Sequence, residues 1–183
     1  MGAPTASAEL EQLIEFVNTI DLEDARDPIG TPALFAAWLS QHGTHGPPGD
    51  VSAATHRRAI DLREGLRALG RHNNQEAAEP ERLHALEAAT AELPLIASLG
   101  TDSGWQLRPR AGGADAFLAW IVATAVRAMA DGRWSRVKAC QNDTCRWLFV
   151  DASRNRSRTW CTMATCGSRM KARAYRARQR PDA

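Results

Sequence analysis

The four cysteines of this 183-residue chain lie close to its C-terminus, in two pairs of equal spacing. Cys140 and Cys145 form one Cys-x₄-Cys pair, and Cys161 and Cys166 form the second after 15 intervening residues. Four thiolates close a tetrahedral zinc site, and two short-spaced pairs allow one chain to supply all of them. All four cysteines fit one site, so the pattern predicts one structural zinc ion per chain. An iron–sulfur cluster or two disulfides would use the same residues.

The segment that carries the cysteines is strongly basic. Residues 131–183 hold 13 Lys/Arg and 4 Asp/Glu, a net charge of +9, whereas residues 1–130 hold 10 and 17, a net charge of −7. A charge split of this size indicates two functions, one of them contact with a polyanion. We therefore predict two domains, residues 1–131 and residues 132–183.

A helix is predicted to begin at Cys166 and Gly167 and to run to about Gln179. No acidic residue occurs between Gly167 and Pro181. At 100° per residue, one face is apolar and is expected to pack on the finger; it consists of Met170, Ala174 and Ala177. The adjacent basic face suits the major groove of duplex DNA, where arginine binds guanine edges or phosphates. Its candidate contacts are Arg169, Arg173, Arg176 and Arg180, with Lys171 as a weaker one.

Between the cysteine pairs, residues 147–151 are predicted to form a strand and residues 159–161 a returning strand. The polar turn between them is expected to be flexible and to contact the DNA backbone. Its three candidate residues are Arg154, Arg156 and Arg158. The order of knuckle, hairpin and helix predicts a small α+β, treble-clef-like Cys₄ zinc finger.

The N-terminal domain is predicted to be mainly α with one small β-hairpin. Apolar residues at helical spacing indicate five helices, over residues 8–20, 32–39, 52–70, 80–93 and 114–130. Ser52 is the expected N-cap of the third helix and Gly70 its end. Residues 95–99 and 105–108 are predicted to pair as the hairpin.

Catalytic motifs are not apparent in the N-terminal domain. Its histidines are scattered, and neither a phosphate-binding glycine motif nor a Gly-x-Ser-x-Gly sequence occurs. We expect the protein not to be an enzyme. Candidate contacts to a small-molecule effector are Asn18, Thr19, Trp38 and Trp105, although backbone hydrogen bonding and core packing are the simpler roles for these residues.

The composition is that of a soluble globular protein, with 44% hydrophobic and 24% charged residues. No stretch approaches 18 uninterrupted apolar residues, and the N-terminus lacks the basic and apolar regions of a secretory signal. We therefore expect a cytoplasmic protein with no membrane contact. In that reducing compartment the cysteines are better explained by a metal than by disulfides.

The C-terminal residues resemble the CGNR zinc finger family. The resemblance covers about 40 residues and is carried by Cys140, CRWLFVD at 145–151, SRNRSR at 153–158, WCTM at 160–163 and CGSRMK at 166–171. Ser168 stands where the motif that names the family has Asn. The preceding region is similar, more loosely, to the ABATE domain, through FVNT at 16–19, Trp38-Leu39 and Trp105.

This resemblance implies a bacterial, stress-responsive transcription regulator. The finger would bind DNA, and the N-terminal domain would sense a ligand or a protein. One small finger buries too little surface for tight specific binding, so we also expect a homodimer formed through the N-terminal domain.

Three alternatives use the same residues. The finger is also compatible with a zinc-thiolate redox switch, in which oxidation ejects the metal. Arginines and exposed tryptophans serve single-stranded RNA as well as duplex DNA. An enzyme is the third alternative, with its site in the N-terminal domain and with the finger only directing its location.

Overall fold

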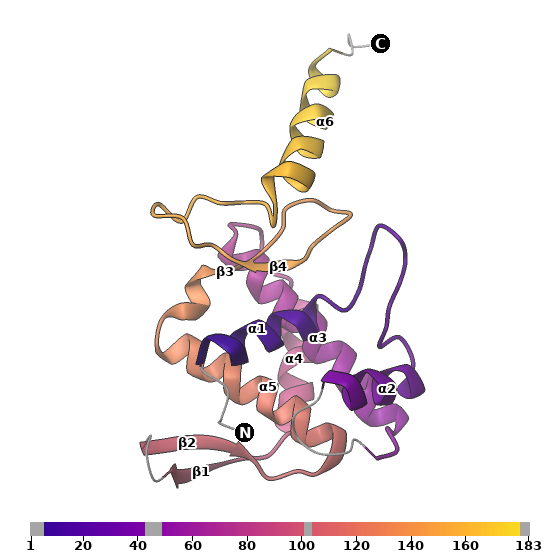
Figure 1. Cartoon of the computed structure of the whole chain (residues 1–183), viewed down its shortest axis with the longest axis vertical. Helices are drawn as coiled ribbons and strands as arrows, with labels where there is room; N and C mark the ends of the chain where they lie inside the picture. The colour runs from indigo at the N-terminus through magenta and orange to yellow at the C-terminus, as the bar shows by residue number, and fades with distance from the viewer. Residues whose placement is uncertain (1–5, 43–48, 101–103, 180–183) are drawn as a thin grey trace.

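The computed structural model describes residues 6–42, 49–100 and 104–179. A helical body occupies most of the molecule, the cysteine segment lies on one end of it, and the last helix projects beyond (Figure 1). The elements are α1 (Ala6–Val17), α2 (Pro32–His42), α3 (Ala53–Asn73), α4 (Pro80–Ala91), β1 (Leu95–Gly100), β2 (Gly104–Pro109), α5 (Gly113–Ala130), the 3₁₀ turn η1 (Arg133–Arg136), β3 (Val137–Ala139), β4 (Leu148–Val150), the π-helical turn η2 (Met163–Gly167) and α6 (Ser168–Arg178). The predicted fold class, a mainly helical domain with a hairpin followed by a small α+β Cys₄ finger, is confirmed.

Helix α5 lies at the centre of the helical body. Its sequence is apolar almost all round, and eleven of its residues are buried. In the described part of the chain it is the one helix with the length and apolarity of a membrane span, but 61% of it is buried inside the protein. Such burial is what the core helix of a globular fold requires.

An aromatic cluster joins α1, α2 and α5. The ring centroid of Phe16 lies 6.2 Å from that of Trp38 and 5.6 Å from that of Phe117, and Trp38 and Phe117 are 5.6 Å apart. Phe16 and Phe117 pack edge-on at 75°, an arrangement that aromatic quadrupoles favour. The apolar spacing of α1 in the sequence is thus accounted for by burial against α5.

Helix α3 begins as predicted but does not end as predicted. The hydroxyl of Ser52 accepts the N–H of Thr55 at 3.0 Å and caps the helix. The prediction that Gly70 ends it is wrong, because the helix continues to Asn73. A Cβ on Gly70 would lie 2.3 Å from Cδ2 of Leu148 and 3.3 Å from the backbone nitrogen of Ala139. Gly70 therefore does not end the helix. Its lack of a side chain permits close packing of the cysteine segment on α3.

The predicted hairpin is present as β1 and β2, which pair antiparallel from Leu95 opposite Pro109 to Gly100 opposite Gly104. The second predicted hairpin is wrong. Strand β4 pairs with β3, and residues 159–161 form no strand. The carbonyl of Thr159 accepts hydrogen bonds from the N–H of Gln141 and the side chain of Asn74, so this segment is held by single contacts and not by a ladder.

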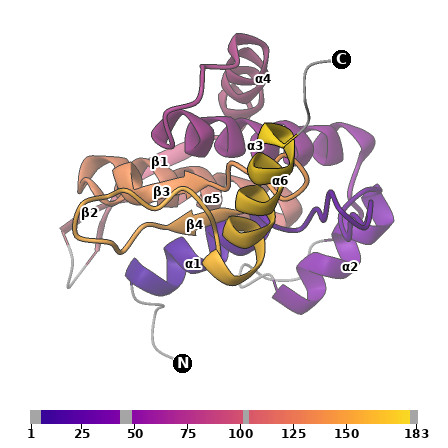
Figure 2. The same ribbon diagram turned by 90° about the horizontal axis from the view of Figure 1, so that it is seen from above.

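The ribbon of β3 and β4 is part of the main core. Figure 2 shows it lying between α1 and α3. Trp134, Val137, Ala139 and Leu148 are all buried in the same apolar cluster as the residues of α1, α3 and α5. Packing is therefore continuous across the sequence boundary that we placed between residues 131 and 132.

Candidate metal centre and nucleic-acid interface

The sulfur atoms of Cys140, Cys145, Cys161 and Cys166 converge on one point. All four Sγ atoms lie within 4.8 Å of one another, and the Cys145–Cys161 and Cys161–Cys166 pairs are each separated by 3.6 Å. Sulfurs around a tetrahedral zinc ion with Zn–S bonds of about 2.3 Å lie about 3.8 Å apart. The four cysteines thus form a site for one structural zinc ion, as the sequence predicted.

The first cysteine pair is shaped by a tight turn after β3. The carbonyl of Asn142 accepts the N–H groups of Cys145 and Arg146 at 2.9 and 3.1 Å. Arg146 has a φ of 57°, which reverses the chain at that point. The N–H of Cys140 then donates to the carbonyl of Trp147 at 2.9 Å, which brings Cys145 back beside Cys140.

The second cysteine pair is held by the π-helical turn η2. The hydroxyl of Thr162 accepts the N–H of Thr165, and the carbonyl of Thr162 accepts the N–H of Gly167 at 3.0 Å. A Cβ on Gly167 would lie 2.8 Å from Sδ of Met163, so a larger residue would fit only if the exposed Met163 side chain moved. Ser168, the departure from the family motif, donates from Oγ to the carbonyl of Met163 at 3.0 Å and secures the same turn.

Without metal, the clustered sulfurs differ in acidity. Hydrogen bonding from Cys145 lowers the pKa of the Cys140 thiol to about 5. Burial, together with the negative charge of Cys140, raises the pKa of the Cys161 thiol to about 11. Four thiolates so close together need a divalent cation to balance their charge. The side-chain amide of Asn142 also donates to Sγ of Cys166, at 3.5 Å.

Helix α6 starts at Ser168, directly after η2, and extends away from the body (Figure 1). Every residue from Lys171 to Gln179 is exposed, including the candidates Lys171, Arg173 and Arg176. Arg180 lies outside the described residues. The expectation that the apolar stripe packs on the finger holds only for Met170, which is half-buried. Ala174 and Ala177 are exposed, because the helix passes the end of the finger after its first turn.

Arg169, at the base of α6, differs from the other arginines of the helix. Its Nη1 atom lies 2.7 and 2.5 Å from the two carboxylate oxygens of Glu23. A groove of about 390 Å³ beside the cysteines is lined by both residues and by Trp147. The Glu23 contact joins residues 146 positions apart, and the linear sequence carries no signal for it.

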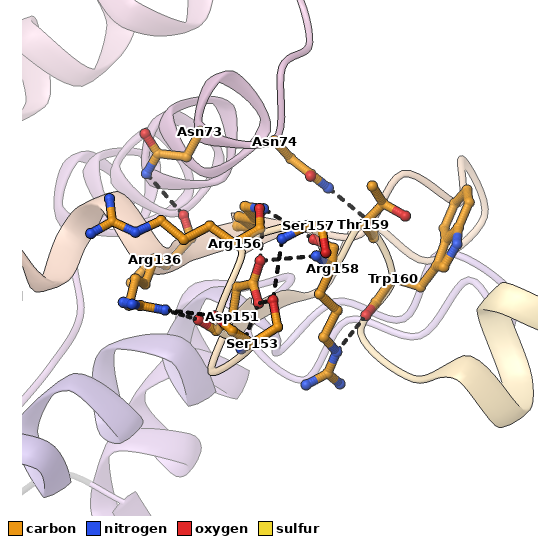
Figure 3. A network of polar contacts seen from close by, with 12 residues as sticks. Asn73, Asn74, Arg136, Asp151, Ser153, Arg156, Ser157, Arg158, Thr159 and Trp160 are labelled. Carbon is orange, nitrogen blue, oxygen red and sulfur yellow. Dashed lines mark hydrogen bonds and ion pairs between the residues drawn. The ribbon is translucent and has the colours of Figure 1, made fainter.

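The arginine turn, residues 151–158, is ordered around a buried carboxylate (Figure 3). Oδ2 of Asp151 accepts from Nζ of Lys138 at 2.8 Å and from the N–H of Arg158 at 3.0 Å, and Oδ1 accepts from the N–H and hydroxyl of Ser153. Burial alone would raise the pKa of Asp151, but these donors outweigh it and hold the pKa below its usual range. The turn is therefore held from inside by hydrogen bonds, a support that the sequence did not predict.

The three arginines of this turn have different surroundings. Arg154 and Arg156 are exposed, and Arg156 has a φ of 50°. Arg158 is directed inward. It donates to the carbonyls of Trp160 and Cys161, and its guanidinium lies 5.0 Å from the centroid of the Phe149 ring.

The candidate effector contacts do not gather into one site. Asn18 pairs with the backbone of Leu148, and Thr19 donates from its hydroxyl to the carbonyl of Phe16 at 2.9 Å. Trp38 is buried in the aromatic cluster, whereas Trp105 lies on β2 and is 74% exposed. Asn18 and Thr19 thus form hydrogen bonds to the backbone, which is the simpler of the two roles considered for them.

A buried charge network attaches the finger to α3. Arg67 donates to the carbonyls of Val17 and Arg146 at 2.6 and 2.9 Å, and Arg146 pairs with Glu76 at 2.7 Å. The sequence predictions did not include these residues. The one signal for them in the sequence is the position of Arg63 and Arg67 directly beside Leu62 and Leu66 of the apolar stripe of α3.

Two family matches cover most of the chain. Residues 136–179 match the CGNR zinc finger, and residues 12–132 match the ABATE family, described as "Putative stress-induced transcription regulator". No curated protein matches this chain. The ABATE match spans more than half of the sequence, and the CGNR match contains all four metal-binding cysteines. The protein thus belongs to the ABATE family and carries a CGNR zinc finger at its C-terminal end.

Proposed function

We propose that this protein is a cytoplasmic, bacterial, DNA-binding transcription regulator and not an enzyme. The zinc site would be structural and would fix the start of α6, which would bind duplex DNA. The observation that carries the proposal is the exposure of α6: residues 171–179 are uncovered, and the helix contains five basic and no acidic residues.

The dimensions of α6 support entry into the major groove. Eleven residues span about 16 Å at 1.5 Å per residue, and the groove is about 12 Å wide. Figure 1 shows the helix extending clear of the body, so its neighbours leave room for a duplex. Arg173 and Arg176 are three residues apart on one exposed face and would contact guanine edges or phosphates.

Contacts to the phosphate backbone of DNA would come from Arg154 and Arg156, which are exposed on the arginine turn. Arg158 would serve the turn itself, since its guanidinium is already bound to carbonyls of the finger. Arg169 would reach a phosphate only in competition with Glu23.

The N-terminal domain would sense a stress-related small molecule or a protein partner. Three contacts of the loop after α1 support communication with the finger: the pairing of Asn18 with Leu148, the hydrogen bond from Trp147 to the carbonyl of Ile20, and the ion pair of Glu23 with Arg169. A change in this loop would therefore alter how the finger and α6 are held.

The test is selection of bound fragments from randomised duplex DNA by the zinc-loaded full-length protein, followed by titration at several salt concentrations. We expect an enriched sequence, and affinity that falls steeply with salt as counterions are released. Failure to bind any duplex at low salt would overturn the proposal. Tighter binding to single-stranded RNA than to the selected duplex would also overturn it, in favour of RNA as the partner.

A further inference from the structure

The β1–β2 hairpin presents an apolar face to solvent. Residues directly opposite in an antiparallel pair share a face, so the register places Ala97 with Leu107 and Leu99 with Trp105 on the same side. All four are exposed. Trp105 and Leu99, at 74% and 69%, are the most exposed large hydrophobic side chains in the described part of the chain.

The outer edge of the hairpin is unprotected. Strand β2 lies against α5, and β1 is outermost (Figure 1). Among the described residues, β2 is the only strand paired with β1. Exposed edges normally carry a charge, a proline or a bulge that prevents pairing with another chain. The sequence of β1, Leu95 to Gly100, reads LIASLG and contains neither charge nor proline.

We infer that β1 forms a homodimer interface, in which it pairs antiparallel with β1 of a second copy. A two-fold axis places identical strands antiparallel, so an edge strand is complementary to itself. The same axis brings identical residues of the two copies together, so a charged surface would repel its copy. The hairpin face carries no charge, and no such repulsion arises there; it consists of Ala97, Leu99, Trp105 and Leu107. The basic helix α6, by contrast, would repel its own copy.

Pairing at the edge would engage β1 itself. It would join the backbone of β1 to that of the second copy and place the side chains of Ala97 and Leu99 beside β1 side chains of that copy. Trp105 and Leu107 lie one strand further in, so they would extend the apolar face of the joined sheet. An isolated two-stranded hairpin is only marginally stable in water, and pairing would extend it to four strands.

The experiment is sedimentation velocity on the zinc-loaded full-length protein between 1 and 100 µM, without DNA. We expect a concentration-dependent dimer for the wild type and at least a tenfold weaker association for Leu99→Lys. The matched control is Leu34→Lys on α2, where the leucine is 47% exposed, and it should associate like the wild type. Because Leu99 is exposed, the thermal midpoint of Leu99→Lys should equal that of the wild type at concentrations at which both are monomeric.

Hydrogen exchange gives an independent readout. On dimer formation, amides of residues 95–100 should become protected at high protein concentration, while those of α6 should not change. A wild type that stays monomeric at 100 µM would overturn the inference. A dimer that Leu99→Lys leaves intact, or one that protects α3 and α4 instead of β1, would also overturn it. None of these results depends on DNA binding, so this inference and the proposed function fail separately.

Discussion

The side-chain amide of Asn18 pairs with the backbone of Leu148 in both directions. Nδ2 donates to the Leu148 carbonyl at 2.9 Å, and Oδ1 accepts the Leu148 N–H at 2.7 Å. The amide thus takes the place of a third strand at the edge of β4. The contact fixes the finger against α1 across 130 residues of sequence.

Replacement of Asn18 by Ala should lower the free energy of unfolding by about 2 kcal/mol. The variant loses two hydrogen bonds and leaves a partly buried donor and acceptor unpaired. Urea denaturation measures the change. Asn155→Ala, at an exposed position of the arginine turn, is the matched control and should differ from the wild type by less than about 0.5 kcal/mol. Equal effects of the two substitutions would show that the Asn18 contact does not hold the finger.

Gly70→Ala should destabilise the protein by about 1–3 kcal/mol, because the added methyl group would overlap Leu148 and force β4 away from α3. Gly112→Ala is the control. A Cβ there has no neighbour within 4 Å and the φ of −110° suits any residue, so a smaller loss is expected. Thermal melts of both variants test this. A stable Gly70→Ala protein would mean that α3 and the cysteine segment are not in close contact.

Metal analysis of protein purified under reducing conditions should give one zinc per chain, and Cys145→Ser should bind zinc more weakly. Zinc requires thiolates, so bound metal should be released as the pH falls and the sulfurs take up protons. Thr165→Ser, at an exposed position of η2, should retain full zinc occupancy. Bound iron, or a metal-free protein with two disulfides, would contradict the zinc assignment.

Removal of zinc by a chelator should melt the cysteine loops and α6 but not the helical body. Trp134, Val137, Ala139 and Leu148 belong to the main core and do not depend on the metal for burial. Far-ultraviolet circular dichroism should therefore retain most of the helical signal. Complete unfolding on chelation would show that the finger contributes more to the core than its packing indicates.

Arginines of the helix and of the turn should contribute differently to DNA binding. Arg173→Ala and Arg176→Ala should each cost about 1–3 kcal/mol on a selected site and relax its sequence preference. Arg156→Ala should weaken all sequences about equally and lower the salt slope by roughly one unit, as for one lost phosphate contact. Affinity measured against salt on selected and random duplexes separates the two outcomes. Equal losses on both duplexes for all three variants would mean that α6 contacts only the backbone.

Acid should remove a contribution to stability made by Asp27. Burial alone would raise the pKa of this carboxyl, but the bidentate hydrogen bonds and charge of Arg63 outweigh it and lower the pKa below its usual value. A lowered folded-state pKa stabilises the protein above the unfolded-state pKa of about 4, and the contribution is lost as the pH falls toward the folded-state value. Asp27→Asn should therefore lose stability at pH 7 and show a smaller loss relative to the wild type at pH 3.

The measurement for Asp27 is urea denaturation at pH 7, 5 and 3. Asp24→Asn, an exposed neighbour, is the control and should follow the wild-type curve at each pH. A stability difference between wild type and Asp27→Asn that is independent of pH would rule out the proposed role of the carboxylate charge.

The sequence by itself determined the features that depend on local patterns. Cysteine spacing identified the metal ligands, since short chelate turns fix them without reference to the rest of the chain. Apolar periodicity located the helices, and the turn sequence GTDSG at 100–104, between two short segments, located the β1–β2 hairpin. The resemblance to CGNR and ABATE proteins was carried by the same short motifs, and the family matches confirm it.

Only the tertiary structure decided which surfaces are free and which are engaged. Arg158 and Arg156 are equivalent in sequence, yet one is bound to finger carbonyls and the other is exposed. Gly70 reads as a helix stop but is a packing site for Leu148. For Asn18 the sequence left a backbone and a ligand contact open, and the structure shows that it completes a sheet edge. Each of these roles depends on a partner far away in the chain. Propensity and spacing describe only neighbouring residues, so such long-range contacts have no signature in the sequence alone.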